Sequence, residues 1–153
     1  MSKTCLLIAE TIHNRIQPSY QELLHFGAVI TQNRLDRILM VVPGQNPIDP
    51  ARTISRTHPI RTLAIEHPDL LLPNPHLLAG ILPDVINQYQ PNMICMMHTM
   101  RGAQLAASLA VQFDAASITA VASCSFQDDD PVFARSMFNG KLSGEIRTAA
   151  DTV

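Results

Sequence analysis

Short apolar runs alternate along this chain with longer amphipathic segments, and that alternation constrains the fold more than any other feature. Parallel strands are covered on both faces by their connecting helices, so they are typically unbroken apolar runs. Helices show apolar positions at a spacing of three to four residues. The predicted strands are 5–9, 38–42, 62–65, 93–97 and 117–121, and the predicted helices are 20–32, 49–58, 77–89 and the segment that ends near Phe113. The sequence therefore predicts an α/β three-layer sandwich, with a five-stranded parallel sheet and helices on both faces.

The pattern changes after residue 121, where extended segments are separated by turn residues. These segments are 123–127, 132–138 and 141–146. Asn139 and Gly140 predict a hairpin turn, because both residue types accept positive φ. We expect a small antiparallel C-terminal extension with an exposed edge, and hence self-association.

Several residues predict where helices begin or bend. Ser19 is an expected N-cap, and Asp49 is expected to cap a helix that starts with Pro50. Pro83 lies inside the apolar face of helix 77–89 and lacks a backbone donor. We therefore expect a kink or a late helix start at this proline.

Composition limits the classes of partner. The chain has 153 residues, of which 46% are apolar, which is enough for one core, so 1–153 is predicted to be a single domain. Its net charge is -2 and no basic stripe is present, so neither nucleic acid nor a membrane is an expected partner. The run of about five apolar residues near the N-terminus is too short for a signal sequence or a membrane span, and we expect a cytoplasmic protein.

The join between strand 93–97 and the next helix is the best candidate for a ligand site. Thr99, Arg101 and Gly102 offer a hydroxyl, a guanidinium and backbone N–H groups that suit an anion or a nucleotide. In open parallel sheets, ligands bind beyond the carboxyl ends of the strands. An equally good interpretation is that Thr99 caps the helix and Gly102 lets it pack against the sheet.

Familiar catalytic and metal-binding motifs are absent from the sequence. It has no GxGxxG after the first strand, no P-loop lysine and no GxSxG elbow. No two histidines have the i,i+4 spacing of a helical metal site, and the three cysteines, Cys5, Cys95 and Cys124, lack CxxC spacing. We expect no catalytic residues, no metal site and three reduced, buried thiols.

Several segments together resemble a known family. These are the strand LLIAE, the helix TMRGAQLAASLA, the strand SITAV and the hairpin ARSMFNGKLSGEI. In this order they resemble the N-terminal domain of the electron transfer flavoprotein alpha subunit, which has an adenine nucleotide alpha hydrolase-like fold. The chain differs from the family pattern at Ala103, Ser108 and Ala120, so polar contacts through these positions are not expected.

The resemblance implies a non-catalytic scaffold domain that supports a flavin domain and packs on a beta-type subunit for electron transfer. Electron transfer would then belong to the full assembly. It implies that Arg135, Asn139 and Gly140 make partner or interdomain contacts. FAD would be bound by a separate C-terminal domain that these residues do not contain, and no cofactor is expected on this chain alone. The chain would be part of a longer protein or a stand-alone relative.

Two other functions remain open from the sequence. One is a stand-alone domain that binds or senses AMP or ATP near 99–102. The other is a hydrolase, which is the less favoured because no nucleophile and base pair is evident.

Overall fold

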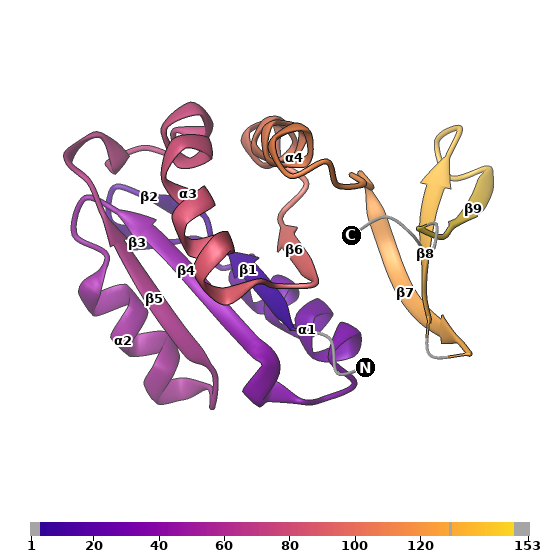
Figure 1. The fold of residues 1–153 in the computed structure, drawn as a ribbon, viewed down its shortest axis with the longest axis horizontal. Helices are drawn as coiled ribbons and strands as arrows, with labels where there is room; N and C mark the ends of the chain where they lie inside the picture. Colours follow the sequence, from indigo (N-terminus) through magenta and orange to yellow (C-terminus); the bar gives the residue numbers. More distant parts are fainter. Residues whose placement is uncertain (1–3, 129, 149–153) are drawn as a thin grey trace.

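The computed structural model describes residues 4–128 and 130–148 and confirms the α/β architecture (Figure 1). Its parallel sheet contains β1 (Cys5–Ile8), β4 (Ile38–Gly44), β5 (Arg61–Glu66) and β6 (Met93–Met96). The helices are α1 (Tyr20–Ile30), α2 (Ile48–Thr57), α3 (Pro75–Tyr89) and α4 (Met100–Gln112), with short 3-10 turns η1 (Leu35–Arg37) and η2 (Pro68–Leu70). Each of the first four predicted strands is confirmed to within one or two residues.

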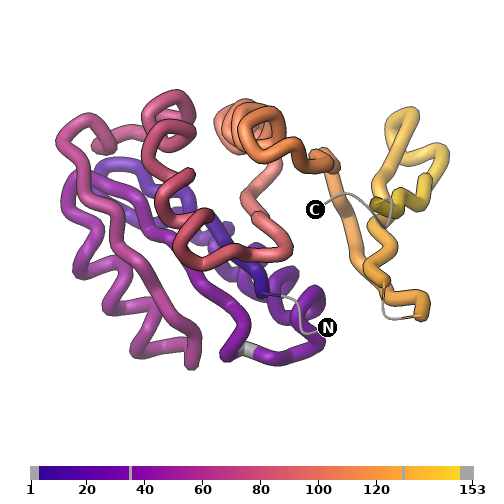
Figure 2. The backbone as a smooth tube through the Cα atoms, viewed as in Figure 1, coloured from indigo at the N-terminus to yellow at the C-terminus, as the bar shows by residue number. Residues whose placement is uncertain are grey.

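The four parallel strands are arranged in the order β5-β4-β1-β6. From β1 the chain moves outward through β4 to β5, then returns over the sheet through α3 and forms β6 on the other side of β1 (Figure 2). The direction of the strand order thus reverses beside β1. In the described part of the chain, β6 pairs with β1 alone.

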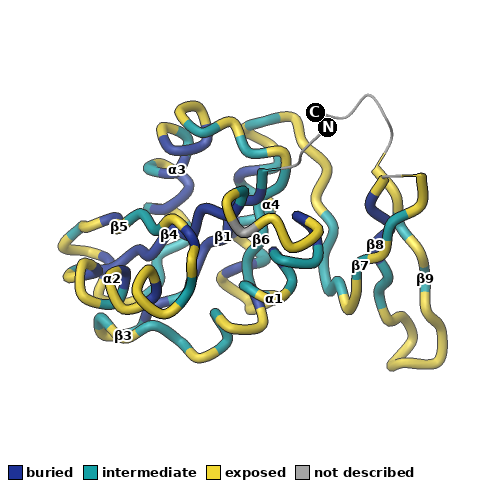
Figure 3. Tube along the Cα trace, turned by 90° about the horizontal axis from the view of Figure 1, so that it is seen from below, coloured by how far each residue is buried: buried dark blue, intermediate teal, exposed yellow. Residues whose placement is uncertain are grey.

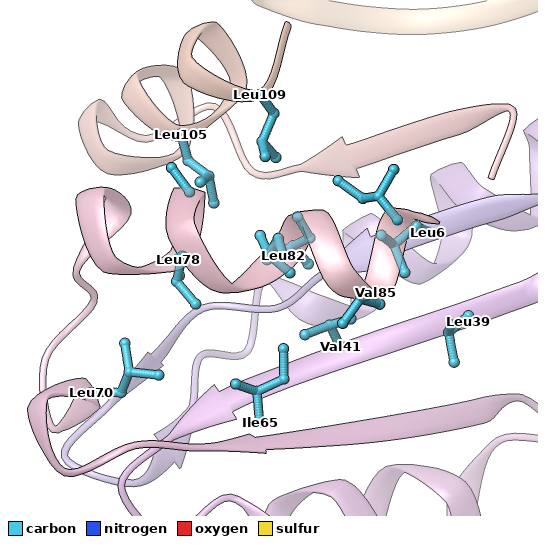
Figure 4. Close-up of a cluster of buried hydrophobic side chains, with 13 residues drawn as sticks. Leu6, Leu39, Val41, Ile65, Leu70, Leu78, Leu82, Val85, Leu105 and Leu109 are labelled. Atoms are coloured by element: carbon cyan, nitrogen blue, oxygen red, sulfur yellow. The ribbon is translucent and has the colours of Figure 1, made fainter. Parts of the chain in front are cut away.

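Helices cover both faces of this sheet. Alternate residues of β1 point to opposite faces, so Leu6 joins the cluster under α3 and α4, whereas Leu7 joins the cluster under α1 and α2. Figure 4 shows the first cluster, in which Leu105 and Leu109 of α4 meet side chains of α3 and of the sheet. The sandwich therefore has three layers, as predicted.

The predicted fifth parallel strand is wrong. Residues 117–120 form no strand, and Ala120 has a φ of 56°, which turns the chain out of the extended conformation. The next residues form β7 (Val121–Gln127), which pairs with β8 (Asp130–Met137) in an antiparallel hairpin. A partner only a few residues away has a small entropic cost of closure, so β7 pairs locally rather than with β6.

The antiparallel extension is confirmed as a three-stranded sheet, β7-β8-β9, in which β9 spans Leu142–Ile146. Asn139 and Gly140 have φ values of 55° and 84°, as the hairpin prediction requires. The turn is longer than two residues, because Met137 pairs with Leu142. The turn between the predicted segments 123–127 and 132–138 includes Asp129, which lies outside the described residues. Figure 3 shows that most of the extension is exposed.

The sequence-based predictions of helix starts succeed only in part. Ser19 occupies the N-cap position of α1, but its side chain makes no capping hydrogen bond. The prediction for Asp49 is wrong, because α2 begins at Ile48 with Pro47 at its N-cap. A proline before the helix already supplies the fixed φ that favours a helix start.

Helix α3 does not start late at Pro83, since it runs from Pro75 with Asn74 as a capping residue. Pro83 has no N–H for the carbonyl of Ala79, four residues earlier. That carbonyl instead accepts a hydrogen bond from Nε2 of Gln112 on α4, at 3.2 Å. The proline thus leaves an acceptor through which α4 is held against α3.

The segment between β1 and α1, where the sequence predicts neither a strand nor a helix, contains a small hairpin. Its strands are β2 (Thr11–Ile12) and β3 (Arg15–Ile16), joined by His13 and Asn14 at positive φ. The Asn14 side chain accepts a hydrogen bond from the backbone N–H of Asn46, at 2.8 Å. This hairpin therefore closes over the loop that follows β4.

Candidate functional site

The carboxyl ends of β1 and β6 lie side by side where the strand order reverses. Ligands of open parallel sheets bind at this kind of position, because the loops that leave the two strands diverge there. After β1 the chain continues into Glu10, and after β6 it reaches Thr99 and the start of α4. The tertiary structure thus brings Glu10 to the predicted site.

Thr99 forms the N-cap of α4. Its hydroxyl oxygen accepts a hydrogen bond from the backbone N–H of Gly102 at 3.0 Å, which satisfies one of the unpaired donors of the first turn. The same hydroxyl donates to Oε1 of Glu10. A carboxylate near a helix N-terminus interacts favourably with the helix dipole, so Glu10 provides an anion from within the chain.

Gly102 is required by the close approach of the backbone. A Cβ built on Gly102 would lie 2.0 Å from the carbonyl oxygen of Met97, and 3.3 Å from Oγ1 of Thr99. Gly102 is itself buried. The sequence-based interpretation of close packing by this glycine is therefore confirmed, as is that of capping by Thr99.

A hollow lies beside this helix start and holds about 420 Å³, including space open to solvent. Its walls are mainly apolar, and the residues that line it are Ile8, Ala9, Glu10, Thr11, Pro43, Leu70, Pro73, Pro75, Leu78, Met96, Arg101, Gly102 and Leu105. Arg101 is exposed and forms no ion pair with any described residue. The hollow thus combines an apolar wall with one guanidinium and one carboxylate.

The charged and polar groups of the hollow do not suit a polyphosphate. An added phosphate at the start of α4 would compete with the Glu10 carboxylate for Thr99 and for the helix dipole. The pyrophosphate of FAD would meet the same repulsion with only Arg101 to offset it. The residues of the hollow therefore do not fit FAD.

The second group of predicted site residues lies in the extension, away from α4. Arg135 is in the middle of β8, opposite Gly144, whereas Asn139 and Gly140 are in the exposed turn before β9. The Nε atom of Arg135 is buried and has no hydrogen-bond partner in the described part of the chain. The structure thus separates Arg135, Asn139 and Gly140 from Thr99, Arg101 and Gly102.

The structure shows two contacts that the sequence analysis missed. One is the hydrogen bond between Thr99 and Glu10, and the other joins the sulfur atoms of Cys5 and Cys95, 3.6 Å apart. They link residues 89 and 90 positions apart, respectively. The sequence signal for them is that Cys5 and Cys95 lie in predicted parallel strands, and that Glu10 and Thr99 follow those two strands. Within the described ranges, no three His, Cys, Asp or Glu side chains gather as a metal site, and no helix has the length and apolar character to cross a membrane.

The parallel sheet, the capped helix after β6 and the antiparallel extension all lie within the range of one family model. A family model for the electron transfer flavoprotein domain matches residues 5–153. The chain belongs to the electron transfer flavoprotein domain family. The match covers essentially the whole chain, so both the sandwich and the extension are parts of the family domain. A search of curated proteins finds no match.

Proposed function

We propose that this electron transfer flavoprotein domain is of the alpha type and acts as a non-catalytic scaffold. It supports a flavin domain and packs on a beta-type subunit in the cytoplasm. FAD is bound by the flavin domain of the assembly and not by the residues of this chain. The alpha-type assignment is supported by the resemblance of TMRGAQLAASLA and ARSMFNGKLSGEI to the alpha-subunit pattern.

The observation that carries this proposal is the exposed apolar surface of the extension. Phe138 is 73% exposed and Leu142 is 56% exposed, and both lie at the β8–β9 turn. Exposed aromatic and aliphatic side chains are typical of the centres of protein interfaces. The sheet β7-β8-β9 buries only Pro131, Val132 and Phe133. A sheet with so small a core of its own gains stability from a partner that covers it.

Arg135 supports the same surface. A buried guanidinium N–H without an acceptor costs free energy, and a partner carbonyl or carboxylate would remove that cost. The side chain is half-buried on β8, next to the residues that lead to the turn. Arg135 would therefore anchor the interface while Asn139 and Gly140 shape its tip.

The test measures binding of a beta-type electron transfer flavoprotein subunit by size-exclusion chromatography with light scattering. We expect a 1:1 complex, and FAD binding only when a flavin domain is also present. Phe138→Glu should weaken the complex about tenfold or more, as loss of an interface aromatic does. The matched control is Val111→Glu on α4, an 85% exposed apolar position outside the extension. Equal affinity of the two variants, or no complex at all, would refute the proposal.

A second candidate function is a stand-alone AMP or ATP sensor, favoured by the position of the hollow at the reversal of strand order. The Glu10 carboxylate at the start of α4 argues against it. Calorimetry with AMP, ATP and FAD distinguishes the two functions. Tight AMP binding by the isolated chain supports the sensor, whereas the scaffold function predicts none.

A further inference from the structure

Sulfur atoms gather on one face of the sheet at β1 and β6. Cys5 of β1 is paired in register with Met93 of β6, and Cys95 is the next residue of β6 on the same face. All three belong to the apolar cluster beneath α1, which also contains Met97. The two strands lie next to each other in Figure 1. Two thiols are thus neighbours across a pair of parallel strands, and the Met93 side chain lies on the same face in register with Cys5.

The spacing of the two thiols suits a shared metal ion. Their sulfur atoms are 3.6 Å apart. A metal–thiolate bond is about 2.3 Å long, so one ion bound to both sulfurs would subtend an S–metal–S angle of about 103°. An ion with three sulfur ligands has angles near about 120°, which the two thiols reach if their sulfur atoms separate by about 0.4 Å.

We propose that Cys5 and Cys95 form a binding site for one soft monovalent ion, Cu⁺, with the Met93 thioether as a third ligand. Thiolate and thioether ligands select Cu⁺ among the biological metals, whereas zinc sites are completed by imidazole, carboxylate or further thiolates. No described His, Asp or Glu joins the two cysteines in such a group. This site is independent of the scaffold function.

Binding displaces two thiol protons and involves no oxidation. The ion must replace the S–H proton of Cys5 and that of Cys95, and both protons are released to solvent. The affinity therefore rises with pH. Cys95 is half-buried on a strand whose outer edge has no partner strand in the described part of the chain, which provides a route of entry.

The same geometry disfavours a disulfide. Because Cys5 is paired with Met93, Cys5 and Cys95 are diagonal neighbours, whose Cα atoms are typically about 7–8 Å apart. Disulfides rarely join Cα atoms that are more than about 7 Å apart. A bridging ion spans this diagonal without moving the strands together.

The test is an anaerobic titration of the reduced full chain with Cu⁺, in competition with the chromophoric chelator bicinchoninate. We expect one bound ion per chain, with the affinity rising with pH and sulfur-only coordination in X-ray absorption spectra. Cys95→Ala should weaken binding at least about tenfold, because it removes one of two thiolates. Cys124→Ser on β7 is the matched control and should bind as the parent chain does. Met93→Leu keeps the apolar volume and should weaken binding less than Cys95→Ala.

Any of several results would overturn the proposal. They are unchanged affinity in Cys95→Ala, loss of the ion in Cys124→Ser, and nitrogen or oxygen ligands in the absorption spectrum. Cys95 is only half-buried, so Cys95→Ala is expected to fold, and circular dichroism of each variant verifies this. Zn²⁺ binding as tight as that of Cu⁺ would equally contradict a soft monovalent site.

Discussion

Substitution of Gly102 by alanine tests whether the backbone approach between β6 and α4 is as close as the structure shows. The new Cβ would lie 2.0 Å from the carbonyl oxygen of Met97. Ordinary carbon–oxygen contacts are about 3.3–3.6 Å, so the two atoms would overlap by about 1.3 Å. The obstacle is backbone and cannot rotate away, so either the strand end or the helix start must move.

The expected cost follows from the size of that movement. Overpacking of a well-packed site typically costs about 1–3 kcal/mol, and a backbone obstacle places Gly102→Ala at the upper end, about 3 kcal/mol. Movement of α4 would also lengthen the hydrogen bond from Gly102 to Thr99. For a chain of this length, 3 kcal/mol corresponds to a fall in melting temperature of about 6–12 °C.

Gly80 provides a matched control for the same substitution. It is exposed in α3, and a Cβ there would meet no atom within 4 Å. Alanine is a better helix former than glycine, so Gly80→Ala should stabilise the protein by about 0.5–1 kcal/mol. Urea unfolding followed by circular dichroism measures both variants. If Gly102→Ala is as stable as Gly80→Ala, the close approach does not exist.

Further substitutions test the cap, the core and the thiol pair. Thr99→Ala should lower the free energy of unfolding by about 1 kcal/mol. Thr99→Ser should lower it much less, because only the hydroxyl is needed for capping. Equal losses of the two variants in urea melts would contradict the cap. Leu82→Ala should lower the free energy of unfolding by about 2–5 kcal/mol, because the Leu82 side chain is fully buried. Leu72→Ala should lower it much less, because Leu72 is 46% exposed. Similar losses in the two variants would argue against the packing of α3. The pKa of Cys5 is raised in the folded state by a hydrogen bond with Cys95 and by burial, so the contribution of its neutral thiol to stability is fully present below the unfolded-state pKa of about 8.5. As the pH rises from there to the folded-state pKa, the free energy of unfolding should fall by up to about 1.4 kcal/mol per pH unit. Cys5→Ala should remove this alkaline loss, and a parent chain equally stable in urea at pH 8 and pH 10 would show that the thiol is not perturbed.

Local patterns predicted much of the fold because they depend on neighbours in sequence. Apolar runs located β1, β4, β5 and β6, since a strand buried on both faces must be apolar throughout. The Thr99 cap and the Asn139–Gly140 turn were also predictable, because capping and positive φ are properties of a few adjacent residues.

Pairing between distant segments was not predictable in the same way. An extended segment such as 117–127 has the same pattern whether its partner is β6 or β8, and the structure pairs β7 with β8. The prediction of a helix start also failed where two local signals competed, as at Pro47 and Asp49.

By itself the sequence determined the four strands of the parallel sheet, the four helices and the start of the helix after β6. Only the tertiary structure decided that β6 lies beside β1. That single adjacency joins Glu10 to Thr99 and Cys5 to Cys95, residues 89 and 90 positions apart. The physical reason is that secondary structure depends on short-range periodicity, whereas strand order depends on which helices pack over which face of the sheet.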